Sequence, residues 1–397
     1  MKTGWSILVV WIGLTAVVAR AWQEDSPTGA AYSESVRYAE AVVELTLDDG
    51  IQNAVKQALD AAMTDYRPDA AWAIVEKVNT GEILAMAARS SDDGGEAAVG
   101  VQSARMNIAA EMVFEPGSIF AVGIVAAALN EGLVDTKSLF DCENGEWAYE
   151  GKPLKDFHPY GTLDVTGVLR KSSGIGTAKI AVLLGDERLS RYLADFGFGK
   201  PTGFEIADEN PGCLRPLSEW GKADIVRMAL GHGVTVSAMQ LLNMLCCIGN
   251  DGTMMRPRLV KRVVGKAGDI LLENRPEVVA RPIAAPTAKL MRDMLVEVTR
   301  EGGTGTRAVV GGFSVAGKTG TAEKIKDGHY VATEKVVSFM GILPAERPVI
   351  GIIVVLDNPQ PEYTGSTSAA LVFATIAKAV APCFPSVSAL QSGMAGK

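Results

Sequence analysis

Residues 114–121 have the sequence Phe-Glu-Pro-Gly-Ser-Ile-Phe-Ala, in which a turn leads straight into a helix. Glu-Pro-Gly favours the turn, and the apolar run through Val125 and Leu129 predicts the helix. Ser118 is therefore expected in the first helical turn, where free backbone N–H groups and the helix dipole favour negative charge. This is how a fold presents a nucleophilic hydroxyl, so Ser118 is the candidate nucleophile.

A serine hydroxyl also needs a base. On a helix, that base would stand about one turn from the serine, on the same face. The residue three positions after Ser118 is Ala121, which carries no basic group. The stretch therefore predicts the position of a nucleophile without its usual partner.

The composition excludes several classes of protein. The chain has 397 residues, is 48% hydrophobic and carries a net charge of −8 with no prominent run of Lys or Arg, so we expect no nucleic-acid partner. Its five cysteines have no CxxC spacing, which argues against a zinc site, and we expect neither a metal nor a cofactor. Cys246 and Cys247 lie in an apolar helical run and should belong to the core. A Cys142–Cys213 disulfide stays open, because nothing in the sequence supports it.

The N-terminus predicts export. Residues 1–22 contain Lys2, an apolar run and then Arg20, which is typical of a signal peptide or a short membrane anchor. Residues 23–46 are polar and read as a tether. We expect the rest of the chain to lie in the periplasm or elsewhere outside the cytoplasmic membrane, attached to that membrane if residues 1–22 are retained.

The middle of the chain predicts a mixed α/β fold. A helix should begin at Asp48, followed by a hairpin over 71–87 and the helix after Ser118, which ends near residue 130. We then expect a loop-rich stretch over 141–161, mainly helical sequence over 164–196, strands within 313–323, 336–343 and 349–356, and a helix over 368–380. This order suggests one antiparallel sheet built from both ends of the chain, flanked by helices, with a helical lobe inserted. We assign residues 47–385 to one domain and 386–397 to a C-terminal tail.

Another motif is Gly317-Lys318-Thr319-Gly320-Thr321, which lies within the strand predicted over 313–323. Lys-Thr-Gly on an edge strand offers a cation, a hydroxyl and an open backbone N–H group, which together can hold a carboxylate and an extended peptide. By itself the motif is equally consistent with a glycine-rich hairpin that exposes a lysine.

Three motifs occur in the order Ser118-Ile119-Phe120-Ala121, Ser172-Ser173-Gly174 and Lys318-Thr319-Gly320. With them, residues 47–385 resemble the transpeptidase domain of penicillin-binding proteins of the monofunctional class B type. The resemblance implies the serine β-lactamase/penicillin-binding-protein fold. It extends to further blocks at 80–86, 196–199, 231–233, 250–252, 303–305 and 338–341.

The resemblance also implies roles. Ser118 corresponds to the nucleophile that attacks a D-alanine carbonyl of a peptidoglycan stem peptide, or a β-lactam, and forms an acyl-enzyme. Ser172 corresponds to a proton-relaying hydroxyl, and the backbone N–H groups of Ser118 and Thr321 correspond to the oxyanion hole. Lys318 is expected to be catalytic, and substrate binding is expected of Lys318, Thr319, Gly320, Thr321 and Ser173.

Two positions depart from the family pattern. The first motif is Ser-x-x-Lys in the family, and Ala121 replaces its lysine; the second is Ser-x-Asn, and Gly174 replaces its asparagine. Ala121 can neither take a proton nor orient the serine. The loss of one member of a catalytic group lowers the rate by orders of magnitude. The sequence therefore predicts a catalytically impaired family member.

Few residues offer a substitute base. Lys171 and Lys179 flank the second motif, and for both a position on an outward helix face is the simpler interpretation. His158, His232 and His329 lie in segments that look like loops, where structural or exposed roles are expected.

Three functions remain open. The first is an impaired domain of peptidoglycan biogenesis that binds stem peptides or proteins of the cell-wall synthesis machinery. The second is an active serine D,D-transpeptidase or carboxypeptidase with a substitute base. The third is a sensor of β-lactams or muropeptides. A β-lactamase is the least favoured, because hydrolysis of an acyl-enzyme requires additional activating groups.

Overall fold

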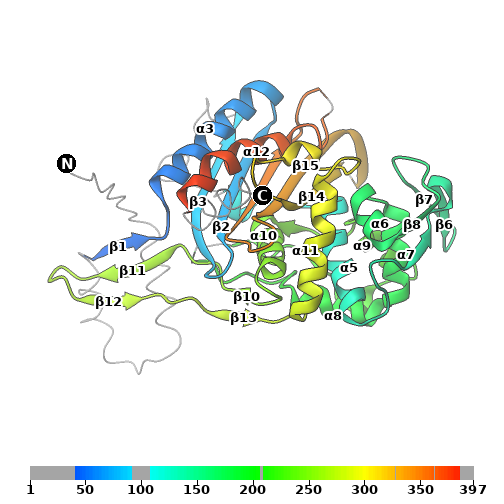
Figure 1. Cartoon of the computed structure of the whole chain (residues 1–397), viewed down its shortest axis with the longest axis horizontal. Coiled ribbons are helices and arrows are strands. Elements are labelled where there is room, and N and C mark those ends of the chain that lie inside the picture. Colours follow the sequence, from blue (N-terminus) through cyan, green and yellow to red (C-terminus); the bar gives the residue numbers. More distant parts are fainter. Residues whose placement is uncertain (1–40, 92–107, 206–208, 327, 362, 385–397) are drawn as a thin grey trace, which may run out of the picture.

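A five-stranded antiparallel sheet in the order β14-β15-β16-β2-β3 forms the centre of the molecule (Figure 1). A computed structural model of the chain describes residues 41–91, 108–205, 209–326, 328–361 and 363–384. The strands are β2 (Ala70–Lys77), β3 (Glu82–Ser90), β14 (Ala316–Lys326), β15 (His329–Leu343) and β16 (Ile350–Asp357). β2 and β16 are neighbours, so the two ends of the domain meet in one sheet, as the sequence predicted.

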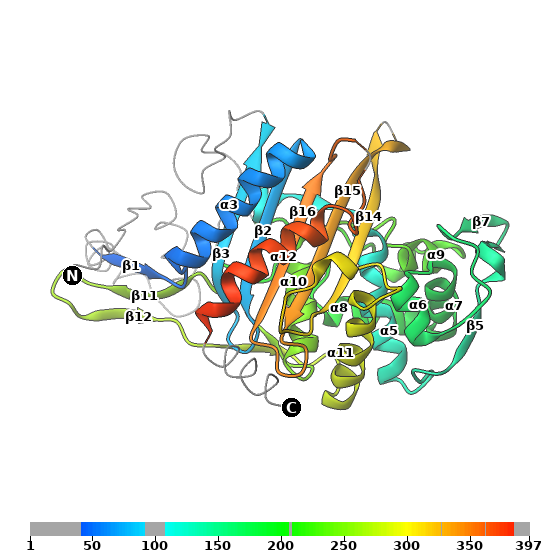
Figure 2. The same cartoon turned by 45° about the horizontal axis from the view of Figure 1, so that its top comes forward.

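Two helices cover one face of the sheet: α3 (Asp49–Tyr66) and α12 (Ala369–Val380) lie side by side across it (Figure 2). The predicted helix start is confirmed, because the Asp48 side chain caps α3 by accepting a hydrogen bond from the N–H of Ile51 at 2.9 Å. Alternate residues of the strands pack against these helices, among them Val75, Phe339 and Val354.

The other face packs on the inserted helical lobe. The predicted apolar helix that follows Ser118 is α5 (Ala121–Asn130), and all but its last residue are buried. Helix α10 (Ala238–Gly249) packs against β2, β15 and β16, and it contains the buried Cys246 and Cys247. The remaining helices on this side are α4 (Ile108–Glu111), α6 (Val165–Lys171), α7 (Gly174–Leu184), α8 (Asp186–Asp195), α9 (Asp224–Ala229) and α11 (Ala285–Thr299).

Short strand pairs complete the lobe. They are β4 (Val113–Phe114) with β9 (Val236–Ser237), β5 (Leu139–Asp141) with β8 (Thr162–Asp164), and β6 (Glu146–Tyr149) with β7 (Lys152–Lys155). The pair β6 and β7 lies inside the stretch 141–161, which was predicted to be rich in loops, and the pair β5 and β8 lies at its two ends.

An arm of short strands extends from the opposite end of the molecule (Figure 1). It contains β1 (Val42–Leu45), β11 (Val260–Val264) and β12 (Ile270–Glu273) in one sheet, next to the pair β10 (Met254–Met255) and β13 (Val278–Ala280). Strand β1 corrects part of the tether prediction, since residues 42–45 pair with β11 instead of running free. The partner strand is more than 200 residues away, so local sequence could not reveal it.

Other N- and C-terminal predictions lie outside the described residues. Residues 1–40, which include the expected signal or anchor, and residues 385–397 are not described. Among the described helices, none has the length and apolar character needed to span a membrane. All five cysteines are described and free, so the open Cys142–Cys213 disulfide is absent.

One buried carboxylic acid stands out in this core. Glu76 of β2 is 0% exposed. Among the described residues, neither of its side-chain oxygens has a partner with hydrogen-bond geometry. Burial raises the pKa of Glu76 to about 8 and outweighs the nearby Cys246 thiol, which lowers the pKa. At neutral pH this side chain is therefore largely a neutral acid.

Candidate active site

The turn that carries Ser118 lies directly against the edge strand β14. Ser118 is in a 3₁₀ turn, η2 (Gly117–Phe120), that runs into α5. Gly117 has a φ of +58°, and a Cβ atom there would lie 2.5 Å from the Thr321 carbonyl oxygen. A Cβ atom on Gly320 would lie 2.4 Å from Ser338 Oγ and 3.2 Å from the Pro116 carbonyl oxygen. Both glycines are needed for this close approach of turn and strand.

Lys318 points from β14 toward the serine. Side chains alternate along a strand, so Lys318 faces the helical lobe together with Ala316. Its Nζ donates to Ser172 Oγ at 2.7 Å, to the Thr319 carbonyl oxygen at 3.0 Å and to Ser118 Oγ at 3.4 Å. The first and third motifs, 200 residues apart in sequence, thus meet at one amine.

The Lys318 amine is fully buried. The residue is 0% exposed, and this burial lowers the pKa of Lys318 to about 7. Ser118 and Ser172 are half-buried, so the hydroxyls on either side of the amine belong to residues that reach the surface. We call Ser118, Ser172, Lys318, Thr319 and Thr321 the serine site.

Ser172 lies at a tight corner between two helices. It ends α6 with φ 57° and ψ 42°, in the left-handed region. For a residue other than glycine this conformation costs about 1–2 kcal/mol. The next residue, Ser173, begins α7 by accepting a hydrogen bond from the N–H of Gly176 at 2.9 Å. This strained corner brings Ser172 Oγ within hydrogen-bond distance of the Lys318 amine.

Ser173 differs from the sequence prediction. It is 1% exposed, and its hydroxyl donates to Asp156 Oδ2 at 2.6 Å. Asp156 also accepts from the N–H of Ile175 at 3.0 Å. Ser173 therefore caps a helix inside the protein, and its side chain does not face a substrate. The motif spacing identified the residue but could not give its direction.

The edge of β14 beside Ser118 carries open backbone groups and hydroxyls. Ser118 Oγ donates to the Thr319 carbonyl oxygen at 3.2 Å, which shows that this residue turns its backbone toward the serine. Backbone groups alternate in direction along an edge strand, so Thr321, two residues on, presents its N–H to the same side. The Thr319 hydroxyl on β14 lies 3.0 Å from the hydroxyl of Thr304, which belongs to the turn after α11.

Ala121 and Gly174, the positions where the sequence analysis expects departures from the family pattern, have different surroundings. Ala121 is 4% exposed and is the first residue of α5. At Gly174, a Cβ atom would lie 2.7 Å from Leu230 Cδ2 and 3.4 Å from Asp156 Oδ1. Leu230 thus stands close to the space that a side chain at position 174 would enter.

The lysines considered as substitute bases are held elsewhere. Lys171 Nζ donates to the Gly302 carbonyl oxygen at 2.9 Å. Lys179 forms an ion pair with Glu143 at 2.6 Å and lies over the ring of Trp147. Among the described residues, the lysine hydrogen-bonded to Ser118 is Lys318, which the sequence did not identify as a substitute base.

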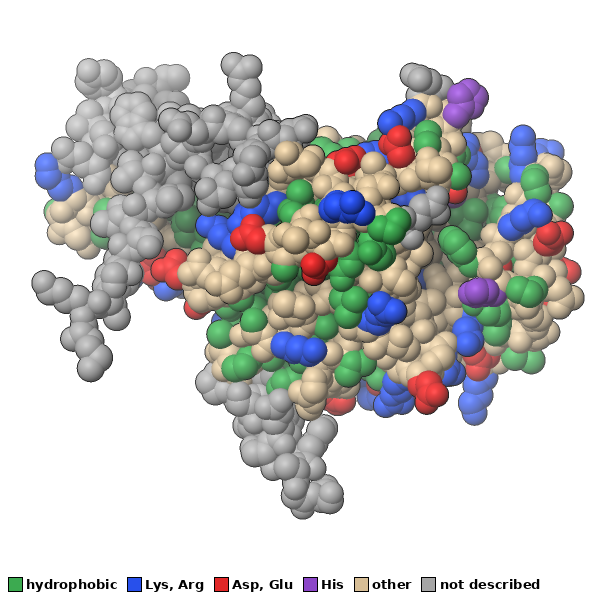
Figure 3. Space-filling view, turned by 90° about the horizontal axis from the view of Figure 1, so that it is seen from above, with side chains coloured by type: hydrophobic (Ala, Val, Ile, Leu, Met, Phe, Trp, Pro, Cys, Tyr) green, Lys and Arg blue, Asp and Glu red, His purple; other side chains and the backbone are tan. Residues whose placement is uncertain are grey.

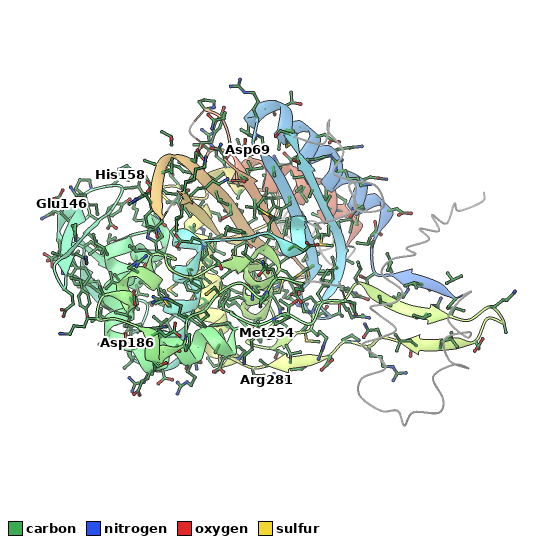
Figure 4. The ribbon with its side chains drawn as sticks, turned by 180° about the vertical axis from the view of Figure 1, so that it is seen from behind. Asp69, Glu146, His158, Asp186, Met254 and Arg281 are labelled. Atoms are coloured by element: carbon green, nitrogen blue, oxygen red, sulfur yellow. The ribbon has the colours of Figure 1, made fainter. Side chains whose placement is uncertain are left out.

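The histidines do not gather at the serine site. Figure 3 shows isolated histidine side chains on the face seen from above, and Figure 4 shows His158 at the helical-lobe end of the molecule with Glu146. His158 is exposed, and His329 is also exposed but begins β15, which corrects its expected loop position. His232 stacks on Tyr330 with ring centroids 5.0 Å apart. In the described part of the chain, no cluster of His, Cys, Asp and Glu is suited to a metal ion.

Comparisons with known proteins agree with this geometry. The family model described as "Penicillin binding protein transpeptidase domain" matches residues 71–378. Stage V sporulation protein D of Bacillus subtilis is 32% identical over 336 residues, which cover 83% of this chain and 52% of that protein. The probable peptidoglycan D,D-transpeptidase PenA of Neisseria flavescens is 32% identical over 332 residues, 83% of this chain and 79% of that protein.

Solved structures give the same result. Penicillin-binding protein 3 of Mycobacterium tuberculosis, complexed with ampicillin, has a TM-score of 0.77 and 33% identity, covering 85% of this chain and 77% of that one. The chain spans about half the length of several curated relatives, 52% and 53% in two of them. The matched family model covers most of the chain and both chain ends meet in the predicted sheet, so this protein belongs to the family of penicillin-binding protein transpeptidase domains.

Proposed function

We propose that this chain acts in peptidoglycan biogenesis as a penicillin-binding domain whose acylation by substrate is slow. Its ligands are peptidoglycan stem peptides that end in D-alanine and the β-lactams that mimic them. One observation carries the proposal: the donor groups along β14 are in place beside Ser118, whereas the residue one turn after the serine is Ala121.

This geometry supports the following roles for the residues of the serine site. Ser118 is the group to be acylated, and the backbone N–H groups of Ser118 and Thr321 stabilise the oxyanion. The Thr319 and Thr304 hydroxyls, 3.0 Å apart, bind the terminal carboxylate of the ligand. Ligand recognition therefore depends on the strand, which has kept its motif, and the slow step is proton removal from the serine.

We also propose that the domain lies outside the cytoplasmic membrane. Peptidoglycan stem peptides are found there, and residues 1–22 have the pattern of a signal or anchor. Proteins of the cell-wall synthesis machinery are natural partners for such a domain.

Labelled penicillin tests the proposal. We expect a slow, stoichiometric covalent adduct in intact-mass analysis, lost in Ser118→Ala, together with reversible binding of the same penicillin to Ser118→Ala. If neither adduct nor reversible binding occurs, the protein is not a penicillin-binding domain in function.

Restoring the family residues tests the cause of the slow step. Ala121→Lys should accelerate acylation, because it returns an amine to the position one turn from the serine. Gly174→Asn should be combined with Leu230→Ala, since the Leu230 side chain otherwise obstructs the new side chain. Unchanged acylation in the triple variant would mean that the impairment lies elsewhere.

A further inference from the structure

We infer that Lys318 is the base that accepts the Ser118 proton in this chain, with Ser172 as the relay that returns it to the leaving nitrogen. The inference rests on the proposed function, since it concerns how the same serine is acylated. It assigns to the third-motif lysine the task that the first motif cannot perform with Ala121.

The first argument is position. The Lys318 Nζ is 3.4 Å from Ser118 Oγ and 2.7 Å from Ser172 Oγ, so one amine contacts the attacking group and the relay. Contacts of this kind are often long before a ligand binds and shorten in the reacting complex. Lys171, the lysine nearest in sequence to the relay, instead donates to the Gly302 carbonyl oxygen.

The second argument is burial. A lysine that only anchored a ligand carboxylate would need an exposed amine, but Lys318 is 0% exposed and its Nζ hydrogens are directed to protein oxygens. The carboxylate has other donors available in the Thr319 and Thr304 hydroxyls. Lys318 is thereby free of that task, and burial favours its neutral form, which is the form a base requires.

The chemical step balances without a further reactant. Neutral Lys318 takes the hydroxyl proton as Ser118 Oγ forms a bond to the carbonyl carbon of the ligand. The carbon–nitrogen bond then breaks. The proton passes from the Lys318 ammonium group through the Ser172 hydroxyl to the departing nitrogen, which leaves Lys318 neutral again.

The inference predicts a pH profile. Acylation of the wild-type chain by labelled penicillin should accelerate as the pH rises from about 5.5 to 9, with a midpoint near 7, because only neutral Lys318 accepts the proton. This measurement needs no variant, so it does not depend on whether a variant folds. A rate that does not change across this range would overturn the inference.

A substitution that keeps the charge gives the second test. Lys318→Arg retains a cation that cannot be deprotonated, so acylation at about pH 8 should fall about 10²- to 10⁴-fold. The same substitution at the neighbouring motif, Lys171→Arg, is the matched control and should leave the rate unchanged. Lys318→Arg acylation within about threefold of wild type would exclude Lys318 as the base.

The two proposals can fail separately. If the wild-type chain forms the adduct at a rate that does not change with pH, or if Lys318→Arg forms it nearly as fast as wild type, only the inference about Lys318 fails. If neither the adduct nor reversible binding of labelled penicillin to Ser118→Ala occurs, the proposed function fails with it.

Discussion

Lys318 and Glu76 are ionisable side chains buried on the same face of one sheet, and their surroundings differ. Lys318, on the edge strand, directs its amine to three oxygens, two of them on the half-buried Ser118 and Ser172. Glu76, on an inner strand, has no partner with hydrogen-bond geometry among the described residues. Burial moves both pKa values toward neutrality, to about 7 and about 8. A perturbed pKa is therefore not enough for chemistry, since a proton must also have a path to and from the group.

The largest expected effect is on the acylation rate, which should depend on Lys318 and not on Glu76. Lys318→Met should lower the acylation rate by labelled penicillin about 10²- to 10⁴-fold, equivalent to about 3–5 kcal/mol in the activation barrier. The loss is expected because Met cannot accept the serine proton. Glu76→Gln, the matched change at the other buried site, should leave this rate unchanged. A slow Glu76→Gln variant would break the comparison.

The same Lys318→Met variant also has a predicted effect on stability. The folded-state pKa of Lys318, about 7, lies below the ordinary value of 10.5. The unfolded chain therefore binds this proton more tightly, and wild-type stability should rise with pH between those two values. Urea unfolding of both proteins at several pH values should show the stability of wild type relative to Lys318→Met rising between about pH 7 and 10.5, a comparison in which the other titrating groups cancel.

The second effect concerns Glu76 and has the opposite slope. Its folded-state pKa, about 8, lies above the ordinary value of 4.5, so the folded state holds the proton more tightly. Its contribution to stability is complete below pH 4.5 and is lost as the pH rises toward 8. Glu76→Gln should be more stable than wild type by roughly 2–4 kcal/mol at about pH 8, with little of this gain at about pH 4. Urea unfolding measures both values, and the exposed Glu273→Gln serves as the control.

The third effect tests the proton path at Lys318. Ser172→Ala removes the relay hydroxyl, which lies 2.7 Å from the Lys318 amine, but keeps the base. Acylation should slow by about 10- to 100-fold, less than in Lys318→Met, because water can protonate the leaving nitrogen less efficiently. The pH midpoint should stay near neutral. A loss as large as that of Lys318→Met would show that relay and base act as one unit.

The smallest effect gives Glu76 a partner. Cys246→Ser replaces a weak thiol donor with a hydroxyl beside the carboxyl group. The pKa of Glu76 should fall, and the stability lost between about pH 4 and 8 should shrink by about 1 kcal/mol. The comparison of the two pH values within each protein cancels the intrinsic effect of the substitution on the core. An unchanged pH dependence would mean that the new hydroxyl does not reach the carboxyl group.

Much of the fold could be predicted from local sequence. Periodicity and capping at Asp48 identified α3, and two apolar runs on either side of a short turn identified the hairpin of β2 and β3. Strand β1 was missed because it is four residues long and its partner, β11, is distant in sequence. Pairing between distant strands depends on the whole fold, and no local pattern encodes it.

The sequence predicted which residues lie together at the site but not the directions in which their side chains point. Motif order placed Ser118, Ser172 and Lys318 together, yet it could not show that the Lys318 amine contacts Ser118. The direction of the Lys318 side chain depends on the face of β14 to which this residue alternates, and that of Ser172 depends on its left-handed backbone conformation. Ser173 was expected to bind substrate because motif spacing does not show where a side chain points. In the structure its side chain points inward and caps a helix.

The close approach of the Ser118 turn to β14 determines which motif residues folding alone requires. Gly117 and Gly320 are required by packing, because any side chain at either position would collide with the opposite backbone or with Ser338. Selection for folding alone would preserve them, even in a lineage under no pressure to acylate. Ala121 is a buried first residue of α5, and folding requires no reactive group at that position. The motif glycines therefore indicate that the fold is kept, and only the side chains between them indicate which chemistry the site can perform.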